Sequence, residues 1–335
     1  MSDSYGLFMG EIRYGIAGSP ITHSLSPLLM ALVCDHLGLV SRTRSLSIEL
    51  VDATSISDAL AWGYAGSVPR PQEWDLTQAV FGKFRTTALL EKAVTAARAV
   101  KIPAAALAPK REAFDGAVAS KHAQSLPTRM FENEIWMNLT SPLKHQLDSE
   151  AVICIDASRD IKSINALRWD GKGWWSAGFD GLGICAVMTH HGFHPQHTVL
   201  GLIGGGGAAR STAHAWSQNG GLIRSLGGGR ELGSGPWMNS MTAKEPDVVV
   251  NFESGTPSFD VDVLLHASYS NMDGALDERV DRMIAMPLDG RWLLVAQHLA
   301  CWKHLWAPER EEELPSLELL LNRLIVAETT LDKYA

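Results

Sequence analysis

The sequence predicts an α/β protein with two domains. Its 335 residues exceed what most single hydrophobic cores hold. Short apolar runs that end in Gly, Ser or Pro, such as Tyr14–Ala17, alternate with segments of helical character. In the segment Val199–Arg210, V-L-G-L-I-G-G-G-G-A-A-R, an apolar run breaks into four successive glycines and then turns helical. Strands that alternate with helices are typical of a sheet with parallel strands.

The N-terminal strand, Tyr14–Ala17, is followed by a loop and a helix. Ser26 is placed as the N-cap of this helix, and Pro27 as its first residue. The hydroxyls of Ser24 and Ser26 are therefore expected at a helix N-terminus, where a small carboxylate could dock. A purely structural interpretation, in which Ser26 only caps the helix and Ser24 is a loop residue, fits these residues equally well.

Residues 52–130 show no pattern that indicates chemistry, and we interpret them as scaffold. They contain a loop rich in Pro and Trp at 68–74, a helical segment at 86–100 and a second helical stretch at 104–124.

Strand character returns at Ile135–Leu139, which opens onto Thr140 and Lys144 at a strand-to-helix turn. A turn at 170–173 and a helix at about Leu182–His191 follow. Four histidines at the end of this helix raise the question of a metal site: His190, His191, His194 and His197. No Cys or carboxylate lies at ligand spacing, so we interpret them as a solvated helix end and expect no metal.

The glycine segment predicts a strand, a tight turn and a helix N-terminus. Gly204, Gly206 and Ala209 fit the G-x-G-x-x-A spacing, which lets the backbone approach a pyrophosphate and the helix pack on the strand. Free amide groups and the helix dipole attract a phosphate there. The helix ends at Asn219, before the short strand Leu222–Ile223, which completes a β-α-β unit. On this motif alone, a flexible glycine turn without a ligand is an equal alternative.

Two strands, at 246–251 and 261–266, and two helices complete the chain. Apolar residues from Trp292 to Trp306 repeat at three- and four-residue steps, a stripe that is more typical of core than of a cofactor site. The last helix is expected at 317–335.

Composition excludes several classes of protein. The net charge of −8 and the lack of a basic stripe argue against a nucleic-acid-binding surface. Four widely separated cysteines, Cys34, Cys154, Cys185 and Cys301, are expected to be buried free thiols, which fits a reducing cytoplasm. Neither a secretory signal nor an apolar run of membrane-spanning length is apparent, so we expect neither secretion nor a membrane span.

Five separated motifs resemble the shikimate dehydrogenase family. In chain order they are G-S-P-I-T-H-S-L-S-P from Gly18, N-L-T-S-P-L-K from Asn138, S-I-N-A-L from Ser163 with D-G ahead of Asp180, I-G-G-G-G-A-A-R from Ile203, and D-G-R-W-L-L-V-A-Q from Asp289. Their order and approximate spacing match the family from Tyr14 to about Trp306. The segment between Pro27 and Asn138 is longer than in the family, which makes 52–130 partly an insertion.

The resemblance implies a substrate-binding domain at 1–190, a Rossmann-like NADP-binding domain at 191–288, and C-terminal helices at 289–335 that return to the first domain. The cleft between the domains would hold the chemistry. That chemistry is the reversible NADP-dependent hydride transfer between 3-dehydroshikimate and shikimate, a step of chorismate and aromatic amino acid biosynthesis. Lys144 and Asp180 would form the catalytic pair.

By the same resemblance, matching positions are expected to bind the ligands. The substrate residues would be Ser24, Ser26, Thr140, Asn165, Tyr269 and Gln297. The cofactor residues would be Gly204, Gly206, Gly207, Ala208, Arg224, Arg230 and Asn251. The partners would be a small cyclic hydroxy-carboxylate and a cofactor, with no nucleic acid and no membrane, in a monomer or a homodimer.

The segment after the glycine motif favours NADP over NAD. An NAD-type unit usually has an acidic residue about 20 positions after the glycines. Here no acid precedes Glu231, and Arg224 and Arg230 are nearby. The family's Asn-Arg-Thr at this point is replaced by Ser225-Leu226-Gly227, which alters the grip on the 2′-phosphate and leaves NAD as the alternative.

Two further departures concern the substrate side. The family's Asn-Thr before the catalytic aspartate is Gly178-Phe179 here, and its Ala-Thr-Ser after the strand asparagine is Phe252-Glu253-Ser254. A bulky ring and an extra carboxylate near the cleft could exclude shikimate or favour a related substrate. Glu253 would also repel an anionic ligand if it faces inward.

Two alternatives to a shikimate dehydrogenase remain open. One is a dehydrogenase of quinate, an aminated analogue or another cyclic hydroxy acid, with NAD as its alternative cofactor. The other is a non-catalytic sensor that binds a nucleotide or metabolite. Retention of both Lys144 and Asp180 argues against the sensor, because binding alone does not require both.

Overall fold

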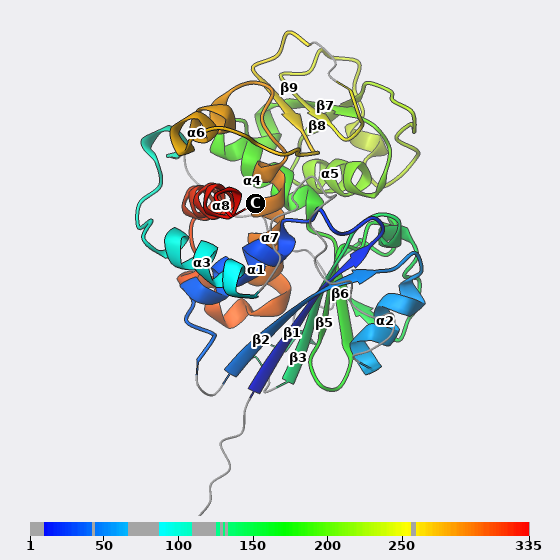
Figure 1. The fold of residues 1–335 in the computed structure, drawn as a ribbon. Coiled ribbons are helices and arrows are strands. Elements are labelled where there is room, and N and C mark those ends of the chain that lie inside the picture. Colours follow the sequence, from blue (N-terminus) through cyan, green and yellow to red (C-terminus); the bar gives the residue numbers. More distant parts are fainter. Residues whose placement is uncertain are drawn as a thin grey trace, which may run out of the picture.

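The structure is a computed structural model that describes residues 10–41, 44–65, 87–108, 125–127, 130, 133–255 and 259–334. The loop expected at 68–74 and most of the helical stretch expected at 104–124 lie outside the described residues. Within the described part, the chain forms two sheets with helices around and between them (Figure 1).

The first sheet has six strands in the order β2-β1-β3-β5-β6-β4. Its strands are β1 (Gly10–Gly18), β2 (Arg44–Asp52), β3 (Asn133–Leu139), β4 (Val152–Cys154), β5 (Ala166–Trp169) and β6 (Trp174–Ala177). β1 is parallel to β2 and β3, whereas β5 is antiparallel to β3 and β6. The carboxyl ends of β1, β3 and β6 therefore share one edge with the start of β5, the edge that faces the second sheet (Figure 1).

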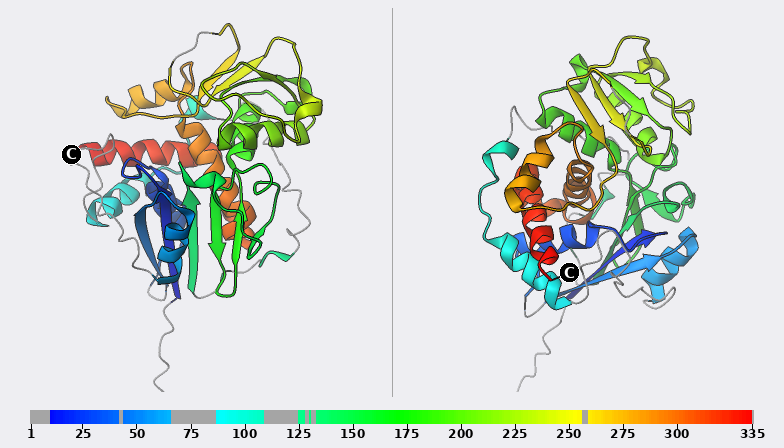
Figure 2. Two further views of the ribbon diagram at one scale, coloured as in Figure 1. Left: turned by 90° about the vertical axis from the view of Figure 1, so that its right-hand side faces the viewer. Right: turned by 45° about the horizontal axis from the view of Figure 1, so that its top comes forward.

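Helices cover both faces of the first sheet. On one face lie α1 (Ser26–His36), α3 (Thr87–Arg98) and α8 (Leu317–Asp332), which pack on one another. The other face is covered by α2 (Ile56–Ala65), whose Trp62 is fully buried. A Cβ atom on Gly15 of β1 would lie 2.6 Å from the Trp62 ring, so this close contact requires glycine. Figure 2 shows the helices on the two sides of this sheet.

The second sheet has four parallel strands in the order β10-β9-β7-β8. They are β7 (Val199–Ile203), β8 (Leu222–Ser225), β9 (Val248–Asn251) and β10 (Val263–His266), and α5 (Gly207–Gln218) connects β7 to β8. This order matches one stretch of a doubly wound dinucleotide-binding sheet, in which the chain changes direction between β7 and β9. The β-α-β unit expected from the glycine segment is confirmed.

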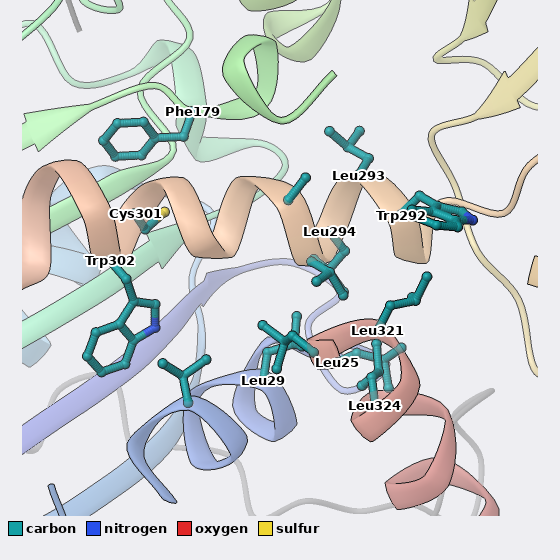
Figure 3. Close-up of a cluster of buried hydrophobic side chains, with 14 of the residues drawn as sticks. Leu25, Leu29, Phe179, Trp292, Leu293, Leu294, Cys301, Trp302, Leu321 and Leu324 are labelled. Atoms are coloured by element: carbon teal, nitrogen blue, oxygen red, sulfur yellow. The ribbon is translucent and has the colours of Figure 1, made fainter. Parts of the chain in front are cut away.

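Three helices join the two sheets. They are α4 (Asp180–His190), α6 (Leu276–Ile284) and α7 (Arg291–Cys301), and short helical turns η1 (Ala105–Leu107), η3 (Leu143–His145), η4 (Pro195–His197), η5 (Met238–Ser240), η6 (Trp302–Trp306) and η7 (Pro308–Glu313) lie in the connections. α7 is buried nearly all round, as its apolar stripe predicted. In Figure 3, Phe179 lies on one side of α7, and leucines of α1 and α8 lie on the other.

Two local expectations are wrong. Ser26 does not cap α1: Leu25 is the N-cap residue, and the Ser24 hydroxyl accepts a hydrogen bond from the Ser26 amide at 3.2 Å. The expected solvated end of α4 is wrong for His190, whereas His191 and His194 are half-buried and His197 is exposed. His190 is buried against Trp292, with its Nδ1 3.4 Å from a Glu318 carboxylate oxygen. An apolar helix end that meets two other helices cannot remain in solvent.

The four cysteines are free and buried, as expected. Across the described residues, no group of His, Cys, Asp and Glu is arranged to hold a metal ion. In the same part of the chain, no helix combines the length and the apolar character that a bilayer crossing requires.

A buried ion pair fixes the centre of the first sheet. Arg168 of β5 and Glu134 of β3 have fully buried side chains, and two hydrogen bonds of 2.8 and 3.0 Å join them. The Arg168 guanidinium also donates to the carbonyl oxygens of Pro127 and Leu305.

We expect Arg168→Met to lower the free energy of unfolding by about 3–5 kcal/mol, because it leaves a buried carboxylate without its cation. Denaturant unfolding measures this. Arg98→Met is the matched control: Arg98 is 58% exposed in its pair with Asp35, so its loss should cost less than about 1 kcal/mol. Equal losses for the two variants would contradict the assignment.

His298 of α7 gives the stability a defined dependence on pH. Its ring is buried between Tyr14 and Trp306, and neither ring nitrogen has a hydrogen-bond partner among the described residues. Burial lowers the pKa of His298 to about 3. The unfolded chain, with a histidine pKa of about 6.5, therefore binds a proton that the folded chain does not, and stability falls as the pH drops below about 6.5.

Between about pH 7 and pH 5, the wild type should lose roughly 2 kcal/mol more stability than His298→Leu, which carries no titrating ring. Urea unfolding of both proteins at the two pH values measures the difference. Identical pH dependence would show that His298 does not stay neutral in the fold.

Candidate active site

The predicted catalytic pair is in direct contact. Lys144 lies in η3, just after β3, and Asp180 is the first residue of α4. The Lys144 Nζ donates to Asp180 Oδ2 at 2.6 Å, and the Asp180 side chain is 2% exposed whereas that of Lys144 is 21% exposed. The amide groups at the start of α4 also favour a carboxylate at this position. The carboxylate is thus fixed while the amine remains accessible.

Asn165, the residue before β5, connects the pair to the rest of the site. Its Nδ2 donates to Asp180 Oδ1 at 2.9 Å and lies 3.3 Å from Gln297 Oε1 of α7. Its Oδ1 accepts from the Phe179 amide at 2.9 Å, which fixes the orientation of the amide group. Asn165, Asp180, Lys144 and Gln297 therefore form one cluster from four elements.

Two glycines of α4 explain how these elements come so close. A Cβ on Gly181 would lie 2.1 Å from the Ser211 carbonyl oxygen of α5, and a Cβ on Gly183 would lie 2.9 Å from the Gln297 amide of α7. The sequence D-G-x-G that starts at Asp180 therefore allows both neighbouring helices to touch α4 beside the Asp180 carboxylate.

The departure at Gly178-Phe179 has a structural reason. A Cβ on Gly178 would lie 2.7 Å from both Ser158 Cβ and the Ser163 carbonyl oxygen, so only glycine fits. The Phe179 ring is fully buried in the main core (Figure 3). It stacks on His304, with 6.0 Å between ring centres. The expectation that a bulky ring near the cleft could exclude a substrate is therefore wrong for Phe179.

Tyr14, whose role the sequence did not indicate, extends the cluster through Asn138, which was expected beside Lys144 at the end of its strand. The Tyr14 hydroxyl donates to Asn138 Oδ1 at 2.6 Å, and Asn138 Nδ2 donates to the Asn165 carbonyl oxygen at 3.2 Å. Burial raises the pKa of Tyr14 well above its ordinary value, and a hydrogen bond with Ser26 opposes this rise. A chain of hydrogen bonds therefore runs from Ser26 to the catalytic pair. In the sequence, only Tyr14 could have signalled this chain of hydrogen bonds: its hydroxyl lies in an apolar strand, and a buried polar atom needs a hydrogen-bond partner.

Ser24 lies beside Tyr269 and is not in direct contact with Lys144 or Asp180. The Tyr269 hydroxyl accepts from the Leu25 amide at 3.3 Å, between the two serines. Burial raises the pKa of Tyr269 to about 12, partly offset by hydrogen bonds from Leu25 and Ser24. The phenol therefore keeps its proton at neutral pH and can act as a donor.

Thr140 lies at the same sheet edge, after β3. Its amide donates to the Ala17 carbonyl oxygen at 2.9 Å. Its methyl group lies so close to Gly18 that a Cβ there would be 2.3 Å away. No hydrogen bond connects the Thr140 side chain to the cluster among the contacts described, so its substrate role stays a prediction.

The glycine turn faces the catalytic pair. Gly204 has a φ of +100°, which favours glycine, and Gly206 precedes the first residue of α5. A Cβ on Gly207 would lie 3.6 Å from Lys144 Cβ, whereas nothing lies within 4 Å of a Cβ on Gly206. The cradle is thus open at Gly206 and adjoins Lys144 at Gly207. These features fit a dinucleotide whose phosphates lie on the α5 N-terminus, beside Ala208, and whose reactive ring reaches Lys144.

A basic cavity of about 460 Å³ adjoins this turn, between the two sheets. His145, Lys162, Arg210 and Arg230 line it, with Asp160 as the acidic member. Arg210, which the sequence did not single out, donates to the carbonyl oxygens of Ile161, Lys162 and Gly205. Arg210 therefore connects the glycine turn to Ile161 and Lys162, which precede β5 of the first sheet.

Two predicted cofactor residues have other contacts. The Nη1 of Arg224 lies 2.5 Å from a Glu245 carboxylate oxygen. Asn251 is buried and organises its own turn: it donates to the Gly255 carbonyl oxygen at 3.0 Å and accepts from the Glu253 amide at 3.0 Å. Their contact with a cofactor stays a prediction.

The fold and the site define a two-sheet α/β protein with a dinucleotide-type second sheet and a lysine–aspartate pair beside its glycine turn. Solved structures with this architecture include the shikimate 5-dehydrogenase of Thermus thermophilus in complex with NADP(H) and shikimate, at a TM-score of 0.53 and 16% identity over 94% of this chain and 99% of that one. The Aquifex aeolicus shikimate dehydrogenase gives a TM-score of 0.51 at 16% identity, over 96% and 97%. The chain thus has the shikimate dehydrogenase fold.

A curated relative points the same way. The shikimate dehydrogenase (NADP(+)) of Anaeromyxobacter sp. (strain Fw109-5) is 24% identical over 211 residues, which are 63% of this chain and 50% of that protein. The match therefore spans half of the relative's length. No family model matches the chain.

Proposed function

We propose that the chain is an NADP-dependent dehydrogenase of the shikimate type, which interconverts 3-dehydroshikimate and shikimate. The observation that carries the proposal is the contact of 2.6 Å between Lys144 Nζ and Asp180 Oδ2, with Asn165 on the other carboxylate oxygen and the glycine turn next to Lys144. The fold and the relatives named above support it.

The protein's part in the reaction is to position groups and to move a proton. Bound at the glycine turn, a nicotinamide dinucleotide would supply the hydride acceptor or donor. When the alcohol is oxidised, Lys144 would take the hydroxyl proton, and it would return that proton to the oxygen when the ketone is reduced. Asp180 would orient the amine and the reacting hydroxyl, while Asn165 and Gln297 would bind ring hydroxyls.

The carboxylate end of the substrate would bind at Ser24 and Ser26. Their hydroxyls are associated with the protonated phenols of Tyr269 and Tyr14, respectively. Neutral donors suit a carboxylate, because each can turn a proton toward it. The carboxylate of Glu253 lies on the loop after β8, on the cofactor side, so the expectation that it acts on the substrate is not supported. A related cyclic hydroxy acid, such as quinate, stays the second candidate substrate.

Absorbance of the reduced nicotinamide, followed with shikimate or quinate and with NADP⁺ or NAD⁺, tests the proposal. We expect the fastest increase with shikimate and NADP⁺. Turnover with quinate alone would support the second candidate. Cofactor binding without turnover of any pair would instead support a sensor and contradict the proposal.

Lys144→Ala should lower turnover by about 10²–10⁴-fold, because the proton then has no positioned acceptor, and should leave substrate affinity nearly unchanged. Lys172→Ala, which removes an exposed lysine in the turn before β6, is the control and should keep full activity. Unchanged turnover in Lys144→Ala would remove Lys144 from the mechanism.

A further inference from the structure

The carboxylate of Glu253 lies beside the glycine turn, hydrogen-bonded to the loop that follows β8. Glu253 follows β9, and its carboxylate accepts hydrogen bonds from the amides of Gly229, at 2.6 Å, and Arg230, at 3.1 Å. These two amides belong to the loop that follows β8. In the second sheet, β7 lies between β9 and β8. The Glu253 side chain, which starts after β9 and reaches the loop after β8, therefore crosses the carboxyl end of β7.

Glycines lie in close contact with this side chain. A Cβ on Gly228 would lie 2.7–2.9 Å from its three carboxyl atoms, and a Cβ on Gly204 would lie 3.1 Å from Glu253 Cγ. Gly227 and Gly228 have φ values of +81° and +129°, which orient the loop around the side chain. The Gly227 carbonyl oxygen accepts from the Gly204 amide at 2.8 Å, which holds the loop on the glycine turn.

The pair of backbone amides is an anion-binding arrangement of the kind that phosphates use. Both amide hydrogen bonds lower the pKa of Glu253, so the group is a carboxylate at neutral pH. In dinucleotide-binding sheets, the loop after the second strand of the β-α-β unit receives the adenosine ribose, and there an acid selects NAD whereas an arginine accommodates the 2′-phosphate of NADP. In this chain β8 is that second strand.

We propose that Glu253 is a cofactor-discriminating residue, whose carboxylate occupies the anion position of the 227–230 loop and competes there with the 2′-phosphate of NADP. This inference rests on the cofactor site of the proposed function and reduces the advantage that Arg230 gives to NADP. The acid that was missing after β8 in the sequence is supplied from the end of β9.

The alternative is that Glu253 favours NADP binding, and the two effects predict opposite results when Glu253 is replaced. Glu253 holds the backbone of Arg230, whose side chain lines the basic cavity. If its main effect were to hold Arg230 toward a phosphate, removing it would weaken NADP binding. Competition predicts that removing it strengthens NADP binding.

The experiment is calorimetric titration of the full chain, without substrate, with NADP⁺, NAD⁺, adenosine 2′,5′-bisphosphate and 5′-AMP. For Glu253→Gln, which removes the charge and keeps one acceptor oxygen, we expect NADP⁺ and the bisphosphate to bind about tenfold more tightly. NAD⁺ and 5′-AMP should change less than about threefold. The gain should shrink at high salt, where charges are screened.

Glu231→Gln is the matched control, because it removes the same charge from an exposed residue of the same segment. It should leave the ratio of NADP⁺ to NAD⁺ affinities nearly unchanged. Weaker or unchanged NADP⁺ binding in Glu253→Gln, or an equal shift in Glu231→Gln, would overturn the inference. Since no turnover is measured, a failure of the dehydrogenase assay leaves this test intact, whereas no binding of any of these nucleotides would overturn the cofactor site itself.

Discussion

The structure depends on the burial of one carboxylate. A charge that is almost withdrawn from water is tolerated only when donors and an opposite charge surround it, and Asp180 has Lys144, Asn165 and the start of α4. These groups come from the turn after β3, the start of β5 and the first turn of a helix. Their convergence positions the first sheet against α4, and Gly181 then brings α5 and the glycine turn into contact with the same point.

The substrate side and the cofactor side of the site differ in the charges of their residues. On the substrate side, neutral donors are arranged in a continuous chain from Ser26 through Tyr14 and Asn138, with the single ion pair at its end. On the cofactor side, the Arg230 side chain lines the basic cavity, and the amide of the same residue donates to the carboxylate of Glu253. Under the proposed role of Glu253, cofactor selection depends on a balance between opposite charges and not on one residue.

The sequence could predict the regular part of the fold and the residues that carry the pair. The glycine segment, the strand before Lys144 and the apolar stripe of α7 are local patterns whose period or spacing defines the structure. Residues fixed by distant partners could not be predicted in this way. Phe179 was placed near the cleft because neighbours in sequence suggested it, whereas its ring is buried and stacks on His304 of η6, more than a hundred positions later. Glu253 reaches a loop that only the order of strands brings beside it.

The return of the C-terminal helices has a consequence for how the chain matures on the ribosome. α8 packs against α1 and α3, so the helical layer of the first sheet lacks a member until Leu317–Asp332 has emerged. The second sheet, by contrast, is contiguous from β7 to β10. Domains generally fold from the N-terminus during synthesis. Here the second sheet can close its core before α8 is made, and the helical layer of the first sheet is completed after it.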